Sequence, residues 1–199
     1  MKKFWRIYGP LIFIAGSIIT FDQLSKSWVR NNIALGEVWS PIDGLEKYAR
    51  IVHWNNTGAA FGMFQDLSLV FTVLAFIVSI AIFYYYPRIP REDWPLRLAL
   101  SLQLGGAVGN LIDRLSIGHV TDFISVGNFA VFNIADASIS VGVAVLVVGI
   151  WINDRLKPQA ADTEGAEESG QEATDKPSEN RSEGTAQNHS HLTEEYLGD

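Results

Sequence analysis

The sequence predicts an all-α membrane protein with four transmembrane helices, a small extracytoplasmic β-rich subdomain and a disordered C-terminal tail. Three observations support this prediction. The 199-residue chain contains four long apolar segments. Many of its Lys and Arg residues lie in the flanks that share one side of the membrane if the chain crosses four times. Half of its 22 acidic residues lie in the last 43 residues, 157–199, after the last apolar segment.

The four apolar segments have the length that crosses a bilayer. They cover residues 7–29, 67–86, 94–112 and 132–153. A helix rises about 1.5 Å per residue, so ~20 residues cross a hydrocarbon core of ~30 Å. The basic start of the chain resembles a secretory signal, but no small-x-small cleavage site follows it. We therefore expect the first segment to stay in the protein as a membrane span.

Basic residues in the short flanks predict the orientation. Lys2, Lys3 and Arg6 precede the first span, and Arg155 and Lys157 follow the fourth. Arg88 and Arg91 lie between the second and third spans, and Arg97 lies near the start of the third. The positive-inside rule makes their side cytoplasmic, with both termini. The outer loops also carry Arg30, Lys47, Arg50 and Arg114, so the bias is moderate.

Two loops are expected outside. The first, about residues 30–66, has β-branched and aromatic residues at 37–39 and 48–54, with Pro41 and Gly44 as turn signals. These features predict a small sheet on the membrane surface. The second outer loop covers about residues 113–131.

Composition divides the chain into a membrane domain, residues 1–156, and a tail, residues 157–199. The tail has three Lys or Arg against eleven Asp or Glu, which leaves twelve against eleven for the rest of the chain. The tail is polar and acidic, which predicts disorder. No basic block indicates nucleic-acid binding. The lack of Cys excludes disulfide and thiolate chemistry.

Unusual polar residues are concentrated at the four helix ends that face outside. They are Asp22, Lys26, Asn55, Asn56, Asn110, Asp113, Arg114, Asp122, Asn133 and Asp136. Ionisable groups near the hydrocarbon are costly, so a functional role is the default hypothesis. Two carboxyls that share a proton, such as Asp122 and Asp136, are typical of acid–base hydrolysis.

Several of these motifs also have a purely structural interpretation. Asp22 and Lys26 have the spacing of a helical ion pair, although Lys26 is also placed to hold a substrate or loop. Asn133 and Asp136 have the spacing of a helix N-cap and its third residue. Arg114 is expected to reach a carboxylate or carbonyl other than that of its neighbour.

Small residues form two further motifs. The run at 56–62 is either an ordinary turn or a site where Asn56 donates to a peptide backbone. Gly105, Gly106 and Gly109 favour close helix packing. His53 and His119 are too isolated to indicate a metal site, and we expect neither a metal nor a cofactor. A small proton-coupled transporter is the alternative function, and a non-catalytic scaffold is a third.

Five sequence blocks in order resemble the bacterial lipoprotein signal peptidases of type II. They are DQLSK at 22–26, NTGAAF at 56–61, GNLIDR at 109–114, VTDF at 120–123 and FNIAD at 132–136. The resemblance covers about residues 5–155 and does not include the acidic tail.

The resemblance implies an aspartic endopeptidase with Asp122 and Asp136 as the catalytic dyad. It implies a substrate cleft lined by Asn56, Asn110, Arg114 and Asn133, with supporting roles for Asp22, Lys26, Asp113 and Gly58. The implied substrate is a prolipoprotein with a diacylglyceryl-modified Cys, cut just before that Cys. We expect a monomer, surrounded by membrane lipids, in the bacterial inner membrane, with its active site on the extracytoplasmic face.

Overall fold

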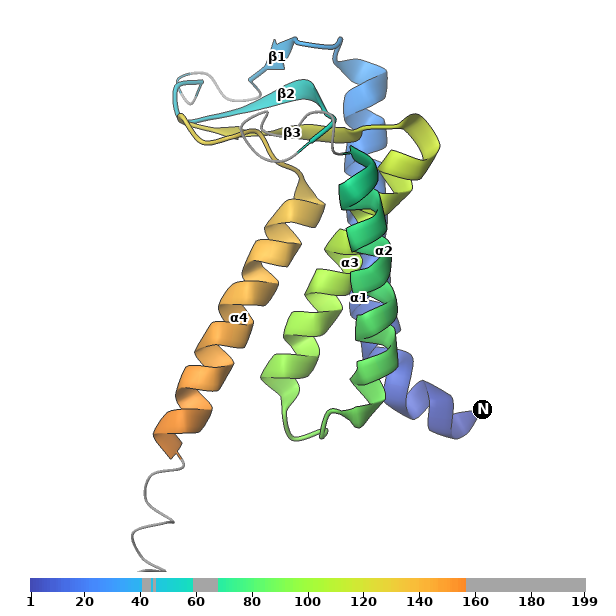
Figure 1. Cartoon of the computed structure of the whole chain (residues 1–199). Coiled ribbons are helices and arrows are strands. Elements are labelled where there is room, and N and C mark those ends of the chain that lie inside the picture. Colours follow the sequence, from blue (N-terminus) through green and yellow to red (C-terminus); the bar gives the residue numbers. More distant parts are fainter. Residues whose placement is uncertain (41–43, 45, 59–67, 157–199) are drawn as a thin grey trace, which may run out of the picture. The chain divides into compact units, whose positions relative to one another are not determined.

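The computed structural model describes residues 1–40, 44, 46–58 and 68–156. Its elements are α1 (Lys2–Asn32), β1 (Val38–Trp39), β2 (Ala49–Asn56), α2 (Ser68–Tyr85), η3 (Tyr86–Arg88), α3 (Trp94–Ile117), β3 (Val120–Val126) and α4 (Ile134–Leu156) (Figure 1). Residues Met1–Arg155 form one compact unit. The predicted acidic tail lies outside the described residues, as does Pro41.

The helices match the predicted spans and extend some of them. Among the described residues, three segments are long and apolar enough to cross a membrane: α1, Ser68–Arg88 and Ile134–Arg155. The remaining helix, α3, has 24 residues but carries two arginines and an aspartate among them. It packs against both α1 and α2. The chain is therefore a mostly helical membrane protein with a small antiparallel sheet.

Local sequence explains where α3 begins and ends. Asp93 is its N-cap and accepts a hydrogen bond from the Leu96 backbone N–H at 3.4 Å, while Pro95 occupies the first turn. Gly118 ends the helix with φ of 81°, a left-handed conformation that favours glycine. The helix therefore stops five residues later than predicted.

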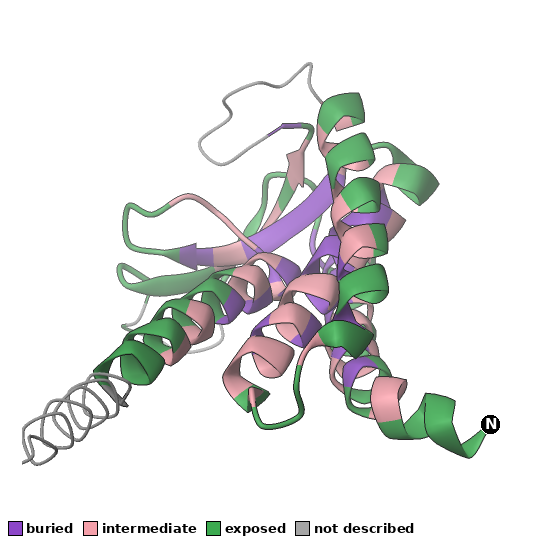
Figure 2. Cartoon of the chain, turned by 60° about the horizontal axis from the view of Figure 1, so that its bottom comes forward, coloured by how far each residue is buried: buried purple, intermediate pink, exposed green. Residues whose placement is uncertain are grey.

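The three strands form one antiparallel sheet in the order β1-β2-β3. The sequence predicted β1 and β2 but treated residues 113–131, which include β3, as a loop. Strand β3 pairs with β2 so that Trp54 lies opposite Asp122. Most of β3 is buried, so it lacks the alternation of a strand with one exposed face (Figure 2). Phe123 of β3 packs with Val29 and Ile33 near the end of α1.

Glycines on α3 allow its neighbours to approach closely, as predicted. A Cβ at Gly105 would lie 2.8 Å from Ile18 of α1, and one at Gly109 would lie 2.8 Å from Asp22 Oδ2. A Cβ at Gly106 would overlap the carbonyl oxygen of Ala135 in α4. Small residues at helix interfaces bring backbones together in membranes. Here they place the start of α4 directly against α3.

Candidate active site

Asp122 is buried in β3 and is held by two asparagine amides. Its Oδ1 accepts a hydrogen bond from Asn133 Nδ2 at 2.7 Å, and its Oδ2 accepts one from Asn56 Nδ2 at 2.8 Å. The Gly58 N–H in turn donates to Asn56 Oδ1 at 2.9 Å. Asn56 and Gly58 thus form the turn that the sequence suggested. In this structure the Asn56 amide group is directed at a carboxylate.

Asp136 lies in the first turn of α4, where it takes part in reciprocal capping. The Asp136 N–H donates to Asn133 Oδ1 at 2.9 Å, and the Asn133 N–H donates to Asp136 Oδ2 at 3.4 Å. The predicted cap is therefore confirmed. Asp136 Oδ1 also accepts a hydrogen bond from Asn110 Nδ2 of α3 at 2.7 Å.

Asn133 and Asn110 connect the two carboxylates through a continuous chain of hydrogen bonds. Asn133 Nδ2 donates both to Asp122 and, at 3.1 Å, to Asn110 Oδ1. Asn110 Nδ2 then donates to Asp136. Both amides are almost fully buried, at 0% and 6% exposure, and such groups require partners. The network fixes the orientation of the two amides, and the amides hold both carboxylates in place.

A buried ion cluster lies behind this network. Lys26 Nζ is 2.7 Å from Asp22 Oδ2 and 3.2 Å from Asp113 Oδ2, and it donates to Asn110 Oδ1 at 2.9 Å. The predicted ion pair between Asp22 and Lys26 is therefore confirmed. Lys26 also reaches the network of the two candidate carboxylates through Asn110. All three charged side chains are at most 1% exposed.

The two carboxylates of the cluster also hold backbone groups from other elements. Asp22 Oδ1 accepts a hydrogen bond from the Ala135 N–H at 3.0 Å, at the start of α4. Asp113 Oδ2 accepts one from the Thr121 N–H at 3.0 Å, next to Asp122. The cluster thus positions the backbone beside each candidate catalytic residue.

Sequence reasoning missed two polar residues of this cluster. Gln23 Nε2 donates to Asp22 Oδ2, to Asp113 Oδ1 and to the Gly109 carbonyl. Arg30 Nη1 lies 3.5 Å from Asp113 Oδ1 and donates to Thr121 Oγ1 at 3.0 Å. Gln23 stands inside the DQLSK block, which was the available signal. Arg30 lies one helical turn after Lys26, but the sequence analysis counted it only as an outer-loop cation.

Arg114 lies near the two candidate carboxylates without a conventional ion pair through its Nε. That atom is buried and has no hydrogen-bond partner among the described residues. The guanidinium carbon lies 5.7 Å from the centre of the Phe71 ring. Its charge interacts with those of Asp136, Asp122 and Asp113. Arg114 therefore acts on the carboxylates as a nearby positive charge.

The environment of Asp122 makes its proton available near neutral pH. Burial, and after it the charge of Asp136, raise the pKa of this carboxyl, which is about 7 when all contributions are included. The hydrogen bonds from Asn56 and Asn133 and the charge of Lys26 oppose the increase. Within the described ranges, no group of three or more His, Asp or Glu side chains is arranged to hold a metal ion.

Known proteins are similar to this chain in sequence and in fold. Residues 14–152 match the model of the family described as signal peptidase (SPase) II. Lipoprotein signal peptidases of Streptococcus pyogenes serotypes M5 and M2 are 39% identical over 136 residues, which is 67% of this chain and 88% of each relative.

Two solved structures are also similar. Both are described as bacterial membrane enzymes. The first has a TM-score of 0.70 and is 30% identical in sequence, and the match covers 76% of this chain and 93% of that protein's chain. The second has a TM-score of 0.64 and is 31% identical in sequence, and the match covers 71% of this chain and 92% of that protein's chain.

The fold, the buried carboxylates and these matches define a membrane peptidase. The chain belongs to the signal peptidase II family. It is thus a bacterial membrane protein of a family that processes lipoproteins, which favours the peptidase hypothesis over the transporter.

Proposed function

We propose that the chain is an aspartic endopeptidase that removes the signal peptide from diacylglyceryl-modified prolipoproteins. It cuts before the lipidated Cys, and Asp122 and Asp136 form the catalytic dyad. The observation that carries the proposal is the buried network in which Asn133 and Asn110 connect these two carboxylates. Family membership supports the reaction class.

In this mechanism the two carboxyls hold one proton between them at neutral pH. The ionised group removes a proton from the attacking water, and the protonated group donates to the scissile carbonyl and then to the leaving amine. The pair titrates as a unit, so the shared proton belongs to both residues. The raised pKa of Asp122 supports a proton held at this site near pH 7.

Arg114 and the amides of the network are the proposed substrate contacts. Asn56, Asn110 and Asn133 already donate to the dyad carboxylates, so they position these groups before any substrate arrives. The buried Nε of Arg114 has no partner among the residues that the structure describes, so it can donate to an additional acceptor, such as a peptide carbonyl of the substrate. These residues align the scissile bond with the dyad.

The proposed topology places the dyad at the extracytoplasmic face of the inner membrane, with both termini in the cytoplasm. The lipid chains of the substrate remain in the bilayer, which sets the height of its scissile bond. The protein acts as a monomer and has no metal or cofactor in this scheme.

The decisive test measures cleavage of a lipidated prolipoprotein peptide by purified variants. Asp122→Asn and Asp136→Asn should each reduce cleavage by about 10²–10⁴-fold or more, because each removes one member of an acid–base pair. Asp154→Asn is the matched control, since Asp154 is exposed near the far end of α4. Cleavage at the parental rate by either dyad variant would remove that residue from the mechanism. The parent should keep its activity when a chelator is added.

A further inference from the structure

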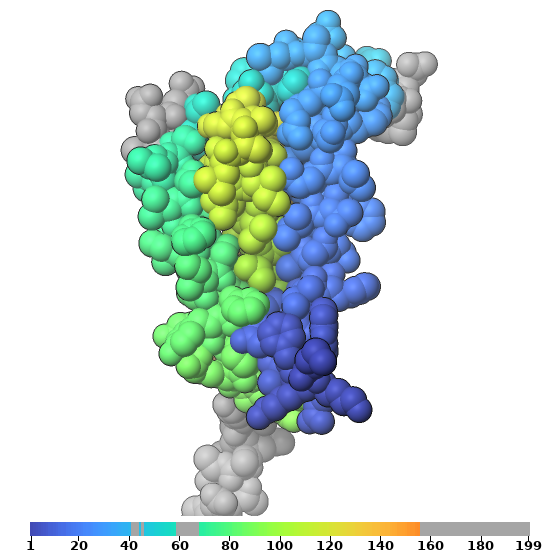
Figure 3. Space-filling model, turned by 90° about the vertical axis from the view of Figure 1, so that its right-hand side faces the viewer, coloured from blue at the N-terminus to red at the C-terminus, as the bar shows by residue number. Residues whose placement is uncertain are grey.

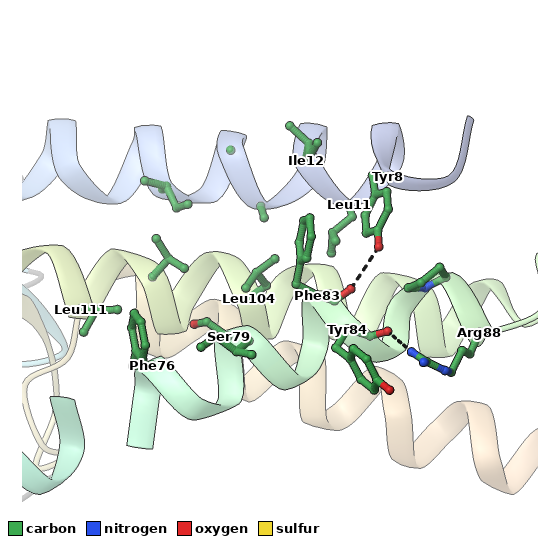
Figure 4. Close-up of a pocket in the computed structure, with 16 residues that line it drawn as sticks. Tyr8, Leu11, Ile12, Phe76, Ser79, Phe83, Tyr84, Arg88, Leu104 and Leu111 are labelled. Atoms are coloured by element: carbon green, nitrogen blue, oxygen red, sulfur yellow. Dashed lines mark hydrogen bonds between the residues drawn. The ribbon is translucent and has the colours of Figure 1, made fainter. Parts of the chain in front are cut away.

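A second hollow is lined by none of the residues of the dyad network. An apolar groove of about 880 Å³ runs between α1 and α2, with α3 as its floor. Leu11 and Ile12 of α1 and Phe76 and Phe83 of α2 line opposite sides, and Leu104 lines the α3 side (Figure 4). A Cβ at Gly16, which also lines the groove, would meet nothing within 4 Å. The groove is therefore open at that point.

A basic pocket of about 540 Å³ adjoins this groove. Its described lining comprises Lys2, Lys3, Arg6, Ile7, Pro87 and Arg91, four of them cationic and none acidic. Pro87 also lines the apolar groove, so the two hollows meet there. Figure 3 shows this face, with the start of α1 next to the connection between α2 and α3.

The chain holds this end of α1 against the connection between α2 and α3. Pro10 has no N–H, which leaves the Arg6 carbonyl without its helical donor. Arg91 Nη2 donates to this carbonyl at 3.0 Å. Arg97 Nη2 likewise donates to the Ile7 carbonyl at 2.9 Å. Nearby Asp93 caps α3, and Glu92 is exposed, so neither lines the pocket.

We propose that this composite site binds an anionic phospholipid of the bilayer, with its acyl chains in the groove and its phosphate in the basic pocket. On α1 the groove is lined from Tyr8 to Ile19, a separation of eleven residues, or about 17 Å at ~1.5 Å per residue. That is close to half of a ~30 Å hydrocarbon core, the depth of one leaflet. Basic pockets between membrane helices are suited to acidic lipid headgroups.

Charge and length both argue against a signal peptide as the occupant. The basic n-region of a signal sequence would be repelled by the four cations. A spanning peptide helix would also need a groove about twice as long. The general positive-inside bias explains why cations lie at this end. It does not explain their arrangement around a pocket that joins an apolar groove.

The test measures thermal unfolding of the whole chain in detergent with added lipid. Phosphatidylglycerol should raise Tm by about 5–10 °C at a concentration ~100-fold above its Kd. Phosphatidylcholine with the same acyl chains should give a much smaller increase. Glycerol 1-phosphate, which has the phosphate but no chains, should give none. Native mass spectrometry should show retained phosphatidylglycerol.

Two variants separate the headgroup from the chains. The double variant Lys3→Gln/Arg6→Gln should bind phosphatidylglycerol roughly 25-fold more weakly, about 5-fold for each cation. Its control, Lys47→Gln/Arg155→Gln, also loses two positive charges but leaves the pocket intact. Gly16→Leu should fill the groove and abolish lipid stabilisation, and leucine favours helix more than glycine. Its control is Val147→Leu on the exposed face of α4.

Three results would overturn the proposal. The first is equal stabilisation by phosphatidylglycerol and phosphatidylcholine. The second is a variant that responds to lipid like its matched control. The third is stabilisation by a synthetic apolar helical peptide and none by phosphatidylglycerol, which would assign the groove to a peptide. None of these measurements involves cleavage, so the result does not depend on the proposed dyad.

Discussion

At the scale of single residues, both the oxygen and the nitrogen of the Asn133 side-chain amide form hydrogen bonds that join parts of the site. Its Oδ1 caps α4 by accepting from the Asp136 N–H, while its Nδ2 donates to Asp122 and to Asn110. A Ser at this position would keep the cap but lose both donated bonds. Asn133, which caps α4, is therefore also the residue that positions the Asp122 carboxylate on β3.

The raised pKa of Asp122 predicts an alkaline limit to activity near pH 7. Its folded-state pKa, about 7, lies above the ordinary 3.8, so the proton needed by the dyad is present below pH 7 and lost above it. The same shift makes the folded state bind more protons between these values, so stability should decrease as pH rises from about 4 to 7. Rates and Tm measured across pH 4–9 check both expectations.

Asn133→Ser should move this alkaline limit to higher pH. The Asn133 hydrogen bond lowers the pKa of Asp122, so its loss raises that pKa further. The variant should also lose about 1–3 kcal/mol of stability, because buried acceptors lose a donor. Asn31→Ser, at an exposed position of α1, is the control. A pH profile of Asn133→Ser that is unchanged or moved to lower pH would contradict this role.

At the scale of elements, the glycine positions on α3 decide where α4 begins. Gly106 faces the Ala135 carbonyl and the Ser138 hydroxyl. Asp136 directly follows Ala135, so this contact lies next to a candidate catalytic residue. Ser138 Oγ also donates to the Leu102 carbonyl of α3 at 3.2 Å. The contact between α3 and α4 therefore sets the position of a dyad carboxylate.

Gly106→Ala should move the start of α4 and reduce activity. The added Cβ would overlap backbone that cannot move aside easily, which costs about 1–3 kcal/mol of stability. A displacement of about 1 Å can cost ~10²-fold in rate. Cleavage assays and thermal unfolding measure both effects. Gly16→Ala is the control, because its Cβ meets open space. Parental activity in Gly106→Ala would show that this contact does not position the dyad.

The sequence predicted the helices of this site well and its third strand poorly. Long apolar runs, caps and glycines make helices predictable from sequence, and both α3 and α4 have these features. Strand β3 is short and mostly buried, and its pairing partner β2 is more than 60 residues away in the chain. Nothing local to residues 120–126 distinguishes such a strand from a loop.

At the scale of the whole molecule, the polar site is built at one end of otherwise apolar helices. Its charges, most of them buried, balance in the proposed mechanism: Lys26, Arg30 and Arg114 oppose Asp22, Asp113 and a dyad that holds one proton. Uncompensated buried charges are costly, so this balance allows the site to exist beside the hydrocarbon. The helices supply the scaffold, and the sheet brings Asp122 to it.

The family match excludes the acidic tail, which leads to a prediction. The match ends at residue 152, and among the described residues the ion cluster and dyad network involve none beyond Asp136. Truncation after Lys157 should therefore leave cleavage of a lipidated peptide within about twofold of the parent. Truncation after Gly142, which removes half of α4, is the inactive control. A large loss on removing only the tail would show that it contributes to activity.

The sequence alone determined the class of fold, the helices and nearly every candidate residue, because apolar runs, helix caps and short motifs are local properties of the chain. It could not decide how these residues connect. That Asn133 joins Asp122 to Asn110, that Lys26 supports this network, and that Gln23 and Arg30 complete the ion cluster depend on contacts between distant segments. Such contacts arise only when α1, α3, α4 and the sheet pack together.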